Sequence, residues 1–221
     1  MTEERRSTDE RWLSGNGAGL VRARSLATAV QSSLERLYQL DRVADVHAFV
    51  EPLGEGEREV LLVRESDGDM ELSLRLPVFP AASFDLSEGG DLDALCQLVE
   101  GVSHFVYLTD RAHDGREATQ LELEVQAEVD KFVMLLAWLA RWDLATSRRV
   151  RSRLFEEVAF LHDTGSEQGE RYRLANETAG RFARRLEERF VGAGRMAEMQ
   201  RELRRFYRMG QEDKLRAPHL L

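Results

Sequence analysis

Histidine and carboxylate side chains are the first candidates for chemistry, because they carry out most acid–base and metal-binding work in proteins. None of the histidines stands at a metal-ligand spacing such as HExxH; they are His47, His104, His113, His162 and His219. Two of them are followed directly by aspartate, at 113–114 and 162–163, but both doublets fall in predicted turns, where aspartate is favoured on its own account. We therefore expect no metal site and no cofactor, and the sequence indicates no catalytic residue.

Three glutamates, Glu117, Glu122 and Glu124, offer an alternative enzymatic reading. On a strand, Glu122 and Glu124 would share one face about 7 Å apart, and paired carboxylates can divide acid and base roles or ligate a cation. A solvated acidic face accounts for the same residues without chemistry. Because no nucleophile elbow, Walker motif or kinase signature is present, an enzyme with an unrecognised site near these glutamates, His104 and His113 remains only an alternative.

Arginines are concentrated at helical spacing in the last third of the chain, in clusters at 148–153, 181–189 and 201–208. Such clusters, with Tyr207 available to stack on a base, make nucleic-acid binding a second alternative. Interleaved glutamates supply salt-bridge partners, and an acidic chain repels a phosphate backbone, so a protein partner is favoured over nucleic acid. The predicted partner-binding residues are Trp12, Arg181, Arg184, Arg185, Arg204, Arg205 and Tyr207.

Charge is divided unevenly along the chain, whose net charge is −9. Residues 1–147 hold 14 Lys or Arg and 28 Asp or Glu, whereas residues 148–221 hold 17 and 12, so the two parts carry −14 and +5. The simpler explanation is that the acidic part docks on the basic helices of the same chain. The other is that the basic helices bind an acidic external partner.

The composition, with 43 % hydrophobic and 32 % charged residues, is that of a soluble globular protein. No segment approaches the ~18 apolar residues that a membrane span needs, and the first twenty residues contain no apolar signal region. The single cysteine, Cys96, excludes an internal disulfide. We expect a cytoplasmic protein that does not contact a membrane.

Hydrophobic periodicity predicts a polar, flexible tail over 1–19, followed by an acidic α+β domain over 20–142. In that domain the pattern predicts an amphipathic helix over 20–40, strands over 44–50, 60–63 and 70–76, a short helix from Asp91, and a strand over 103–109. The Asp-Gly turn at 67–68 favours an antiparallel meander. Beyond it, 143–221 is predicted to be a basic helical extension that packs on a buried helix over 126–142.

The stretch 119–142 has two readings. Alternation of Leu121, Leu123 and Val125 with polar residues predicts a strand that leads into the 126–142 helix, and we favour this reading. Alternatively, Thr119 and Glu122 have the spacing of a helix capping box, and the whole stretch forms one helix.

These elements predict an α+β fold with an N-terminal antiparallel sheet of about five strands and flanking helices, followed by the Arg-rich extension. The order α-β-β-β-α-β-β-α resembles that of the small acidic secretion-chaperone-like fold. The resemblance implies a protein that binds partner polypeptides and dimerises. We therefore expect a non-enzymatic, cytoplasmic adaptor or chaperone-like protein that binds a protein partner or a second copy of itself.

Overall fold

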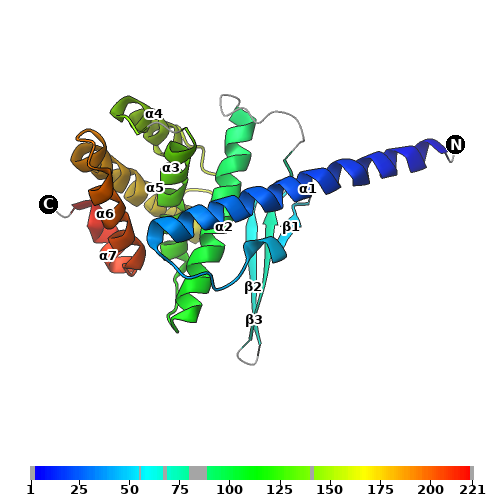
Figure 1. Cartoon of the computed structure of the whole chain (residues 1–221), viewed down its shortest axis with the longest axis horizontal. Coiled ribbons are helices and arrows are strands. Elements are labelled where there is room, and N and C mark those ends of the chain that lie inside the picture. Colours follow the sequence, from blue (N-terminus) through cyan, green and yellow to red (C-terminus); the bar gives the residue numbers. More distant parts are fainter. Residues whose placement is uncertain (1–2, 55, 67–68, 80–88, 140–141, 220–221) are drawn as a thin grey trace. The chain divides into compact units, whose positions relative to one another are not determined.

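The computed structural model divides the chain into two compact units, Met1–Ser32 with Ala44–Phe105, and Ser33–Val43 with Val106–Leu221. It describes residues 3–54, 56–66, 69–79, 89–139 and 142–219; the side chains of 3–16, 65–66, 69 and 89–91 lie outside this description. Helices α1 (Glu3–Tyr38) and α2 (Gly89–His113) each run from one unit into the other (Figure 1).

Helix α1 confirms the predicted helix over 20–40 as far as Tyr38. In the first unit its residues Ala23, Ala27 and Val30 are fully buried, as expected for positions three and four residues apart on one face. Most residues of the predicted tail over 1–19 belong to this helix, because α1 begins at Glu3.

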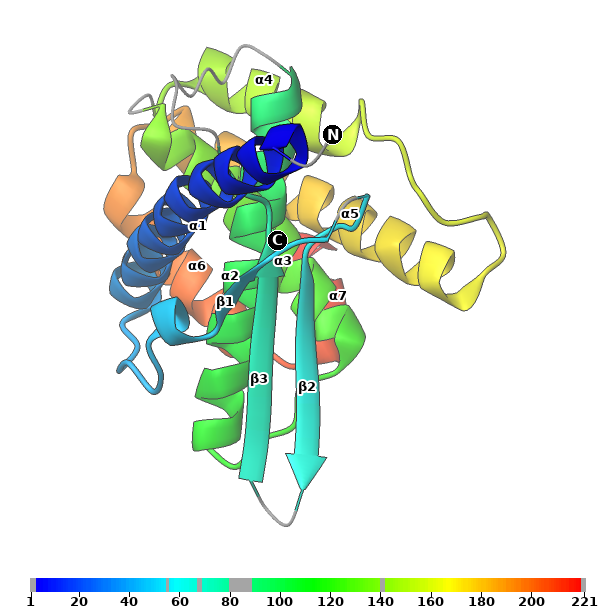
Figure 2. The same ribbon diagram turned by 90° about the vertical axis from the view of Figure 1, so that its right-hand side faces the viewer.

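The sheet of the first unit has three strands, β1 (Val50–Pro52), β2 (Val60–Ser66) and β3 (Asp69–Leu76), in the order β1-β3-β2. Figure 2 shows β2 and β3 as a long antiparallel pair, and β1 pairs with β3 in the parallel direction. The predicted five-stranded antiparallel sheet is therefore wrong, and so is the meander. The predicted first strand is replaced mainly by a 3-10 turn, η1 (Val46–Ala48), and only its last residue, Val50, lies in β1.

The third strand has the predicted apolar face. Leu74 and Leu76 are fully buried, and they pack against α2 at Gly101. A Cβ atom at Gly101 would lie 2.9 Å from Leu76 Cδ2 and 3.0 Å from Leu74 Cδ1. This glycine therefore allows the helix to approach the sheet closely.

The predicted strand over 103–109 is wrong, because these residues lie within α2. Five of the six residues from Val102 to Tyr107 are buried, and His104 is half-buried, so buried side chains point to most sides of the helix. A helix buried on every side has no 3.6-residue period to distinguish it from a strand, and aromatic and β-branched residues in this stretch favoured the wrong element.

Residues 120–138 form one helix, α3 (Gln120–Trp138), so the favoured strand-then-helix reading is wrong and the helix-only reading is confirmed. The Thr119 hydroxyl accepts a hydrogen bond from the Glu122 backbone N–H, and the Glu122 side chain accepts one from the Thr119 backbone N–H. This capping box fixes where the helix begins.

The rest of the second unit is helical, as predicted for 143–221. Its elements are α4 (Leu144–Phe155), α5 (Glu167–Leu186), a π-helical turn η2 (Glu187–Val191), α6 (Met196–Arg208), α7 (Gln211–Arg216) and a 3-10 turn η3 (Ala217–His219). Helix α3 packs against α4, α5 and α7. Its buried residues include Phe132 and Leu136.

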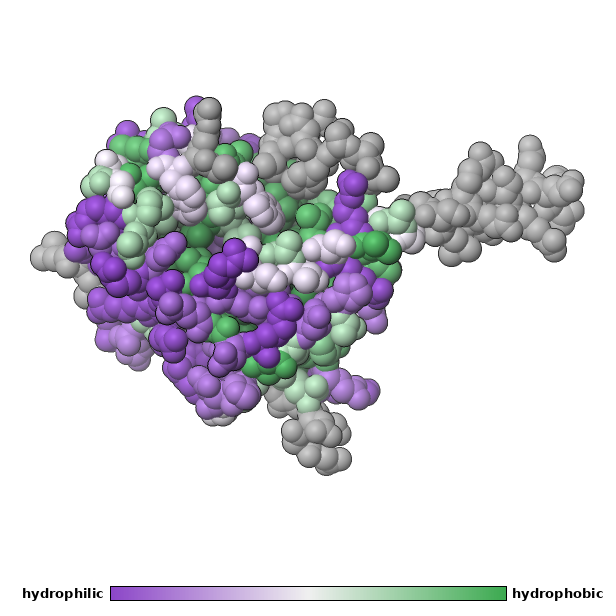
Figure 3. All heavy atoms as spheres, in the orientation of Figure 1, coloured by the Kyte–Doolittle hydropathy of each residue, from purple (hydrophilic) through white to green (hydrophobic). Residues whose placement is uncertain are grey.

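Polar residues dominate the outer surface of α6 and α7 in the view of Figure 3. Beneath this surface, Met199, Leu203 and Phe206 of α6 are buried. None of the described helices has the combination of length and apolar sequence that crossing a bilayer demands.

Candidate functional site

An open groove on the second unit collects arginines from several elements. It has a volume of about 700 Å³, and its walls are the C-terminal half of α4, one face of α5, the π-helical turn η2 and the turn η3. We call it the arginine groove. Its charged lining residues are Arg151, Glu156, Glu177, Arg181, Arg184, Arg185, Glu188 and Arg189. Five arginines against three glutamates give the lining an excess of positive charge.

Local sequence signals determine where α4 and α5, the two helices that line the groove, begin. The Asp143 carboxylate caps α4 by accepting a hydrogen bond from the Thr146 backbone N–H at 2.8 Å, and the Ser166 hydroxyl caps α5 by accepting one from Gly169 N–H at 3.0 Å. The helices approach closely at Gly180, where a Cβ atom would lie 3.1 Å from Phe155 Cβ. Gly180 and Phe155 thus form part of the groove lining.

The π-helical turn lies at the C-terminal end of α5, over Glu187–Val191. A π turn contains one residue more than an α turn and so changes the direction of the side chains that follow; such turns are frequent at functional sites. Here the side chains of the consecutive residues Glu187 and Glu188 lie in different environments. Glu187 is buried at 3 % exposure, whereas Glu188 and Arg189 line the groove.

Some groove arginines are already paired. Arg151 donates to Glu156, and its Nε lies 2.8 Å from Glu187 Oε2. Hydrogen bonds from Arg151 and Ser152 lower the pKa of Glu156, so this carboxylate remains ionised at neutral pH. Arg181 is paired with Glu177 one helical turn away. The Arg151–Glu187 pair joins α4 to η2.

Other groove arginines keep donors available. Arg184 is 61 % exposed, and within the described residues its carboxylate partner is the distant Glu156 at 3.8 Å. Arg189 is exposed and has no carboxylate partner in the described part of the chain; its guanidinium lies 5.9 Å from the Phe190 ring. A guanidinium presents five N–H donors, so Arg184 and Arg189 can accept an anionic ligand.

Arg185 lies in an electrostatically unfavourable position. Burial lowers its pKa, and Arg189 and Arg205 lower it further, while Glu202 at 3.1 Å acts in the opposite direction. Its Nε is buried without a hydrogen-bond partner. An additional anion in the groove would offset this repulsion between arginines.

Three of the predicted partner-binding residues, Arg181, Arg184 and Arg185, thus lie together in the groove. The others lie elsewhere. Arg204 Nε donates to the Leu37 carbonyl at 2.7 Å, and Arg205 is exposed at 62 % outside the groove lining. Tyr207 is only 3 % exposed and stacks on Tyr38 with a centroid separation of 4.3 Å, so its ring cannot stack on a base. Trp12 is within α1, and its side chain lies outside the described part of the chain.

No protein-family model, curated protein or solved structure matches this chain.

A second group of polar residues is buried in the core of the same unit. Gln126 and Asp130 stand one turn apart on α3, and Gln126 Nε2 donates to Asp130 Oδ1 at 2.9 Å and to the Tyr38 hydroxyl at 3.1 Å. The Tyr38 hydroxyl in turn donates to Asp130. Burial and the neighbouring Asp130 raise the pKa of Tyr38 well above its ordinary value, so the phenol keeps its proton. This network joins the end of α1 to α3.

The C-terminal segment contributes a buried amine to this network. Lys214 of α7 is 1 % exposed, and its Nζ donates to Gln126 Oε1 at 2.6 Å. The Nζ atom lies 4.9 Å from the centroid of the Tyr107 ring and 4.4 Å from that of Phe206. Burial lowers the pKa of Lys214 to about 7. None of the described pockets includes Lys214 in its lining, so we assign this amine no catalytic role.

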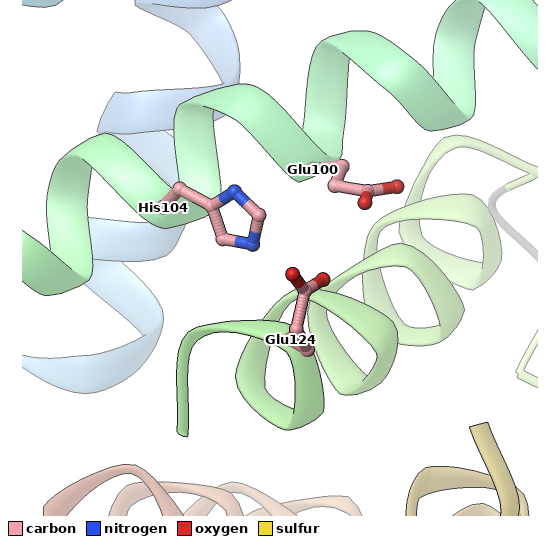
Figure 4. Close-up of side chains that lie close together, drawn as sticks. All are labelled: Glu100, His104 and Glu124. Atoms are coloured by element: carbon pink, nitrogen blue, oxygen red, sulfur yellow. The ribbon is translucent and has the colours of Figure 1, made fainter. Parts of the chain in front are cut away.

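Figure 4 labels two of the candidate acid–base residues, His104 and Glu124, together with Glu100, which the sequence did not indicate. Glu100 and His104 stand on successive turns of α2 in the first unit, and Glu124 belongs to α3 in the second (Figure 4). Two side chains from one helix are fewer than the three protein ligands of a typical catalytic zinc site, so the Glu100 and His104 pair by itself supports no metal site. Glu122 acts as the helix cap described above, and the His162 ring stacks on Tyr172.

Sequence reasoning missed Gln126, Asp130 and Lys214. The i, i+4 spacing of Gln126 and Asp130 within an apolar stretch was a signal for a buried polar pair. Lys214 carried no such signal, because it lies in the charged run QEDKLR.

Proposed function

We propose that this chain is a protein-binding protein whose arginine groove holds an acidic segment of a partner polypeptide. The observation that carries the proposal is the convergence of five arginines from α4, α5 and η2 on one groove. Arg184 and Arg189 supply exposed donors, and Arg185 supplies a charge that is incompletely compensated.

The form of the groove fits a polypeptide segment. Four of its guanidinium groups are distributed along α5 and η2 over more than two helical turns, from Arg181 to Arg189, and Phe155 and Pro218 add apolar surface. Carboxylate side chains spaced along an extended peptide can each meet a guanidinium in bidentate geometry. The glutamates of the lining, Glu177 and Glu188, would disfavour a continuous polyanion such as a nucleic-acid backbone.

The test is direct binding of labelled probes to the full chain, followed by fluorescence anisotropy. The probes are a ten-residue peptide of alternating glutamate and serine, a peptide of alternating lysine and serine, and a ten-nucleotide single-stranded DNA. We expect the acidic peptide to bind and the basic peptide not to bind. Preferential binding of the DNA would replace the proposal with nucleic-acid recognition.

Charge reversal within the groove provides the matched control. The double variant R184E/R189E should weaken binding of the acidic peptide by on the order of tenfold or more, since both close charge pairs become repulsive. R201E/R208E makes the same change of net charge at two exposed positions of α6 outside the groove lining, and should change the affinity by less than about twofold. Equal loss in R201E/R208E and in the groove variant would show that net charge, and not the groove, governs binding.

A further inference from the structure

Several side-chain contacts attach the C-terminal segment 210–219 to the rest of the second unit. Thr119 Oγ1 donates to Gln211 Oε1 at 2.8 Å, Lys214 Nζ donates to Gln126 Oε1, and Arg185 donates to the Ala217 carbonyl. Ala217 is fully buried. The last two residues, 220–221, lie outside the described part of the chain.

Lys214 is the central attachment of the segment. Its side chain is almost completely buried, but not all of its N–H donors have hydrogen-bond acceptors in the described part of the chain. An ammonium group has three donors, but Gln126 Oε1 is its one hydrogen-bond acceptor within the described part of the chain. The Tyr107 and Phe206 rings lie on the amine and attract a cation, but burying an ammonium ion costs more than this attraction returns. The site therefore accommodates a neutral amine better than an ammonium ion.

Charged and titratable groups surround this amine from each packed element. On α3, Asp130 and Glu122 favour the ammonium form, whereas Arg111 of α2 opposes it. The neighbouring phenols of Tyr38, Tyr107 and Tyr207 have raised pKa values. On the segment itself the charged groups are Glu212, Asp213, Arg216 and His219. Desolvation outweighs the two carboxylates, and the pKa of Lys214 in the docked segment falls to about 7.

We propose that residues 210–219 form a latch that is held to the second unit by the neutral amine of Lys214 and is loosened when that amine takes up a proton. The direction follows from linkage. A freely solvated lysine has a pKa of about 10.4, so between about pH 7 and pH 10 the undocked segment holds a proton that the docked segment lacks. Docking then strengthens as the pH rises, and below about pH 7 both forms are protonated and the dependence ends.

The latch also affects the arginine groove, and this consequence rests on the proposed function. Pro218 and His219 form part of the groove wall, and Arg181 lies 3.3 Å from His219 Nε2. Release of the latch removes that wall and frees Arg185 from the Ala217 carbonyl. A change in pH would thereby change the groove that an acidic segment meets.

The latch is tested by hydrogen–deuterium exchange of the full chain between pH 7 and pH 9. Rapid-mixing labelling and mass spectrometry would follow the amides of 211–219, each corrected for the intrinsic exchange rate at that pH. We expect protection of these amides to rise with pH by up to roughly tenfold per pH unit. Amides of α6, which belong to the same unit, should change by less than about twofold.

The chain has only two lysines, Lys131 and Lys214, and this provides a matched pair of variants. K214M keeps the apolar stem but removes the titrating amine, and protection of 211–219 should become higher at pH 7 and independent of pH. K131M removes the lysine that pairs with Glu128 at 2.8 Å on α3, and should retain the pH profile of the natural sequence. K214Q replaces K214M if the latter does not fold.

Protection of 211–219 that does not change with pH in the unmodified chain would overturn the latch. An unchanged pH dependence in K214M would also overturn it, because this variant retains His219 but lacks the amine. Neither result depends on peptide binding. Conversely, loss of acidic-peptide binding in the groove variant leaves these exchange profiles unaffected, so failure of the proposed function and failure of the latch can be told apart.

Discussion

At the scale of single residues, the buried tyrosines of the second unit differ in how their hydroxyls are used. Tyr38 and Tyr207 stack on each other and are both almost completely buried. The Tyr38 hydroxyl donates to Asp130, whereas the Tyr207 hydroxyl has no hydrogen bond of standard geometry in the described part of the chain. The nearby Asp110 nevertheless interacts with it and contributes to its raised pKa. The two rings therefore offer an internal comparison.

We expect Y38F to lower the free energy of unfolding by about 1–3 kcal/mol, because it leaves the buried Asp130 carboxylate without one of its donors. Y207F should be close to neutral, since it removes a buried hydroxyl that lacks a good partner. Urea denaturation, followed by circular dichroism, measures the free energy of unfolding of both variants. If Y207F costs as much stability as Y38F, the account of the network is incorrect.

The sequence predicted single residues unevenly. Arg181, Arg184 and Arg185 were recognisable because their spacing placed them on one side of a helix, and that side lines the groove. Tyr207 follows Phe206 directly, and the α6 pattern did not reveal that both rings are buried. Burial of Lys214 depends on Tyr107 and Gln126, which are more than 80 residues away, and no local pattern contains that information.

At the scale of elements, errors occurred where a helix is buried on several sides. Glu122, Glu124 and Gln126 of α3 are all less than 10 % exposed, so the polar positions that suggested an exposed strand face are in fact inside. The capping-box spacing of Thr119 and Glu122 was the better guide, because cap hydrogen bonds are local and do not depend on the rest of the fold. The sequence located β2 and β3 within a few residues, but it placed the first strand before β1.

Helix α4 provides an element-scale prediction, because it holds Arg151 and Phe155 against the groove. The Asp143 carboxylate caps this helix through Thr146. D143A should cost about 1–2 kcal/mol of stability, whereas D143N keeps a capping oxygen and should cost less than about 0.5 kcal/mol. Thermal unfolding at neutral pH compares the two variants; equal losses would mean that the cap contributes nothing specific.

At the scale of the whole molecule, the distribution of charge affects any partner. The chain carries −9 overall, so the proposed acidic segment would be repelled at long range and attracted close to the arginine groove. The net negative charge would therefore disfavour weak association of an acidic partner elsewhere on the surface.

Contacts in the groove are partly exposed, so salt should screen them. We expect the affinity for the acidic peptide to fall by on the order of tenfold between 50 mM and 500 mM sodium chloride, measured by anisotropy titration. Affinity that is independent of salt would indicate that apolar contacts, such as those of Phe155, dominate instead.

The measurement that tests the central claim most directly is the location of the bound peptide. An acidic peptide with a benzophenone group at its centre would be irradiated with the full chain, and the crosslinked residues would be identified by mass spectrometry. The account predicts crosslinks to Phe155, to residues 177–189 and to Pro218, and their loss in R184E/R189E. Crosslinks confined to other surfaces, such as the exposed apolar side chains of β2, would contradict it.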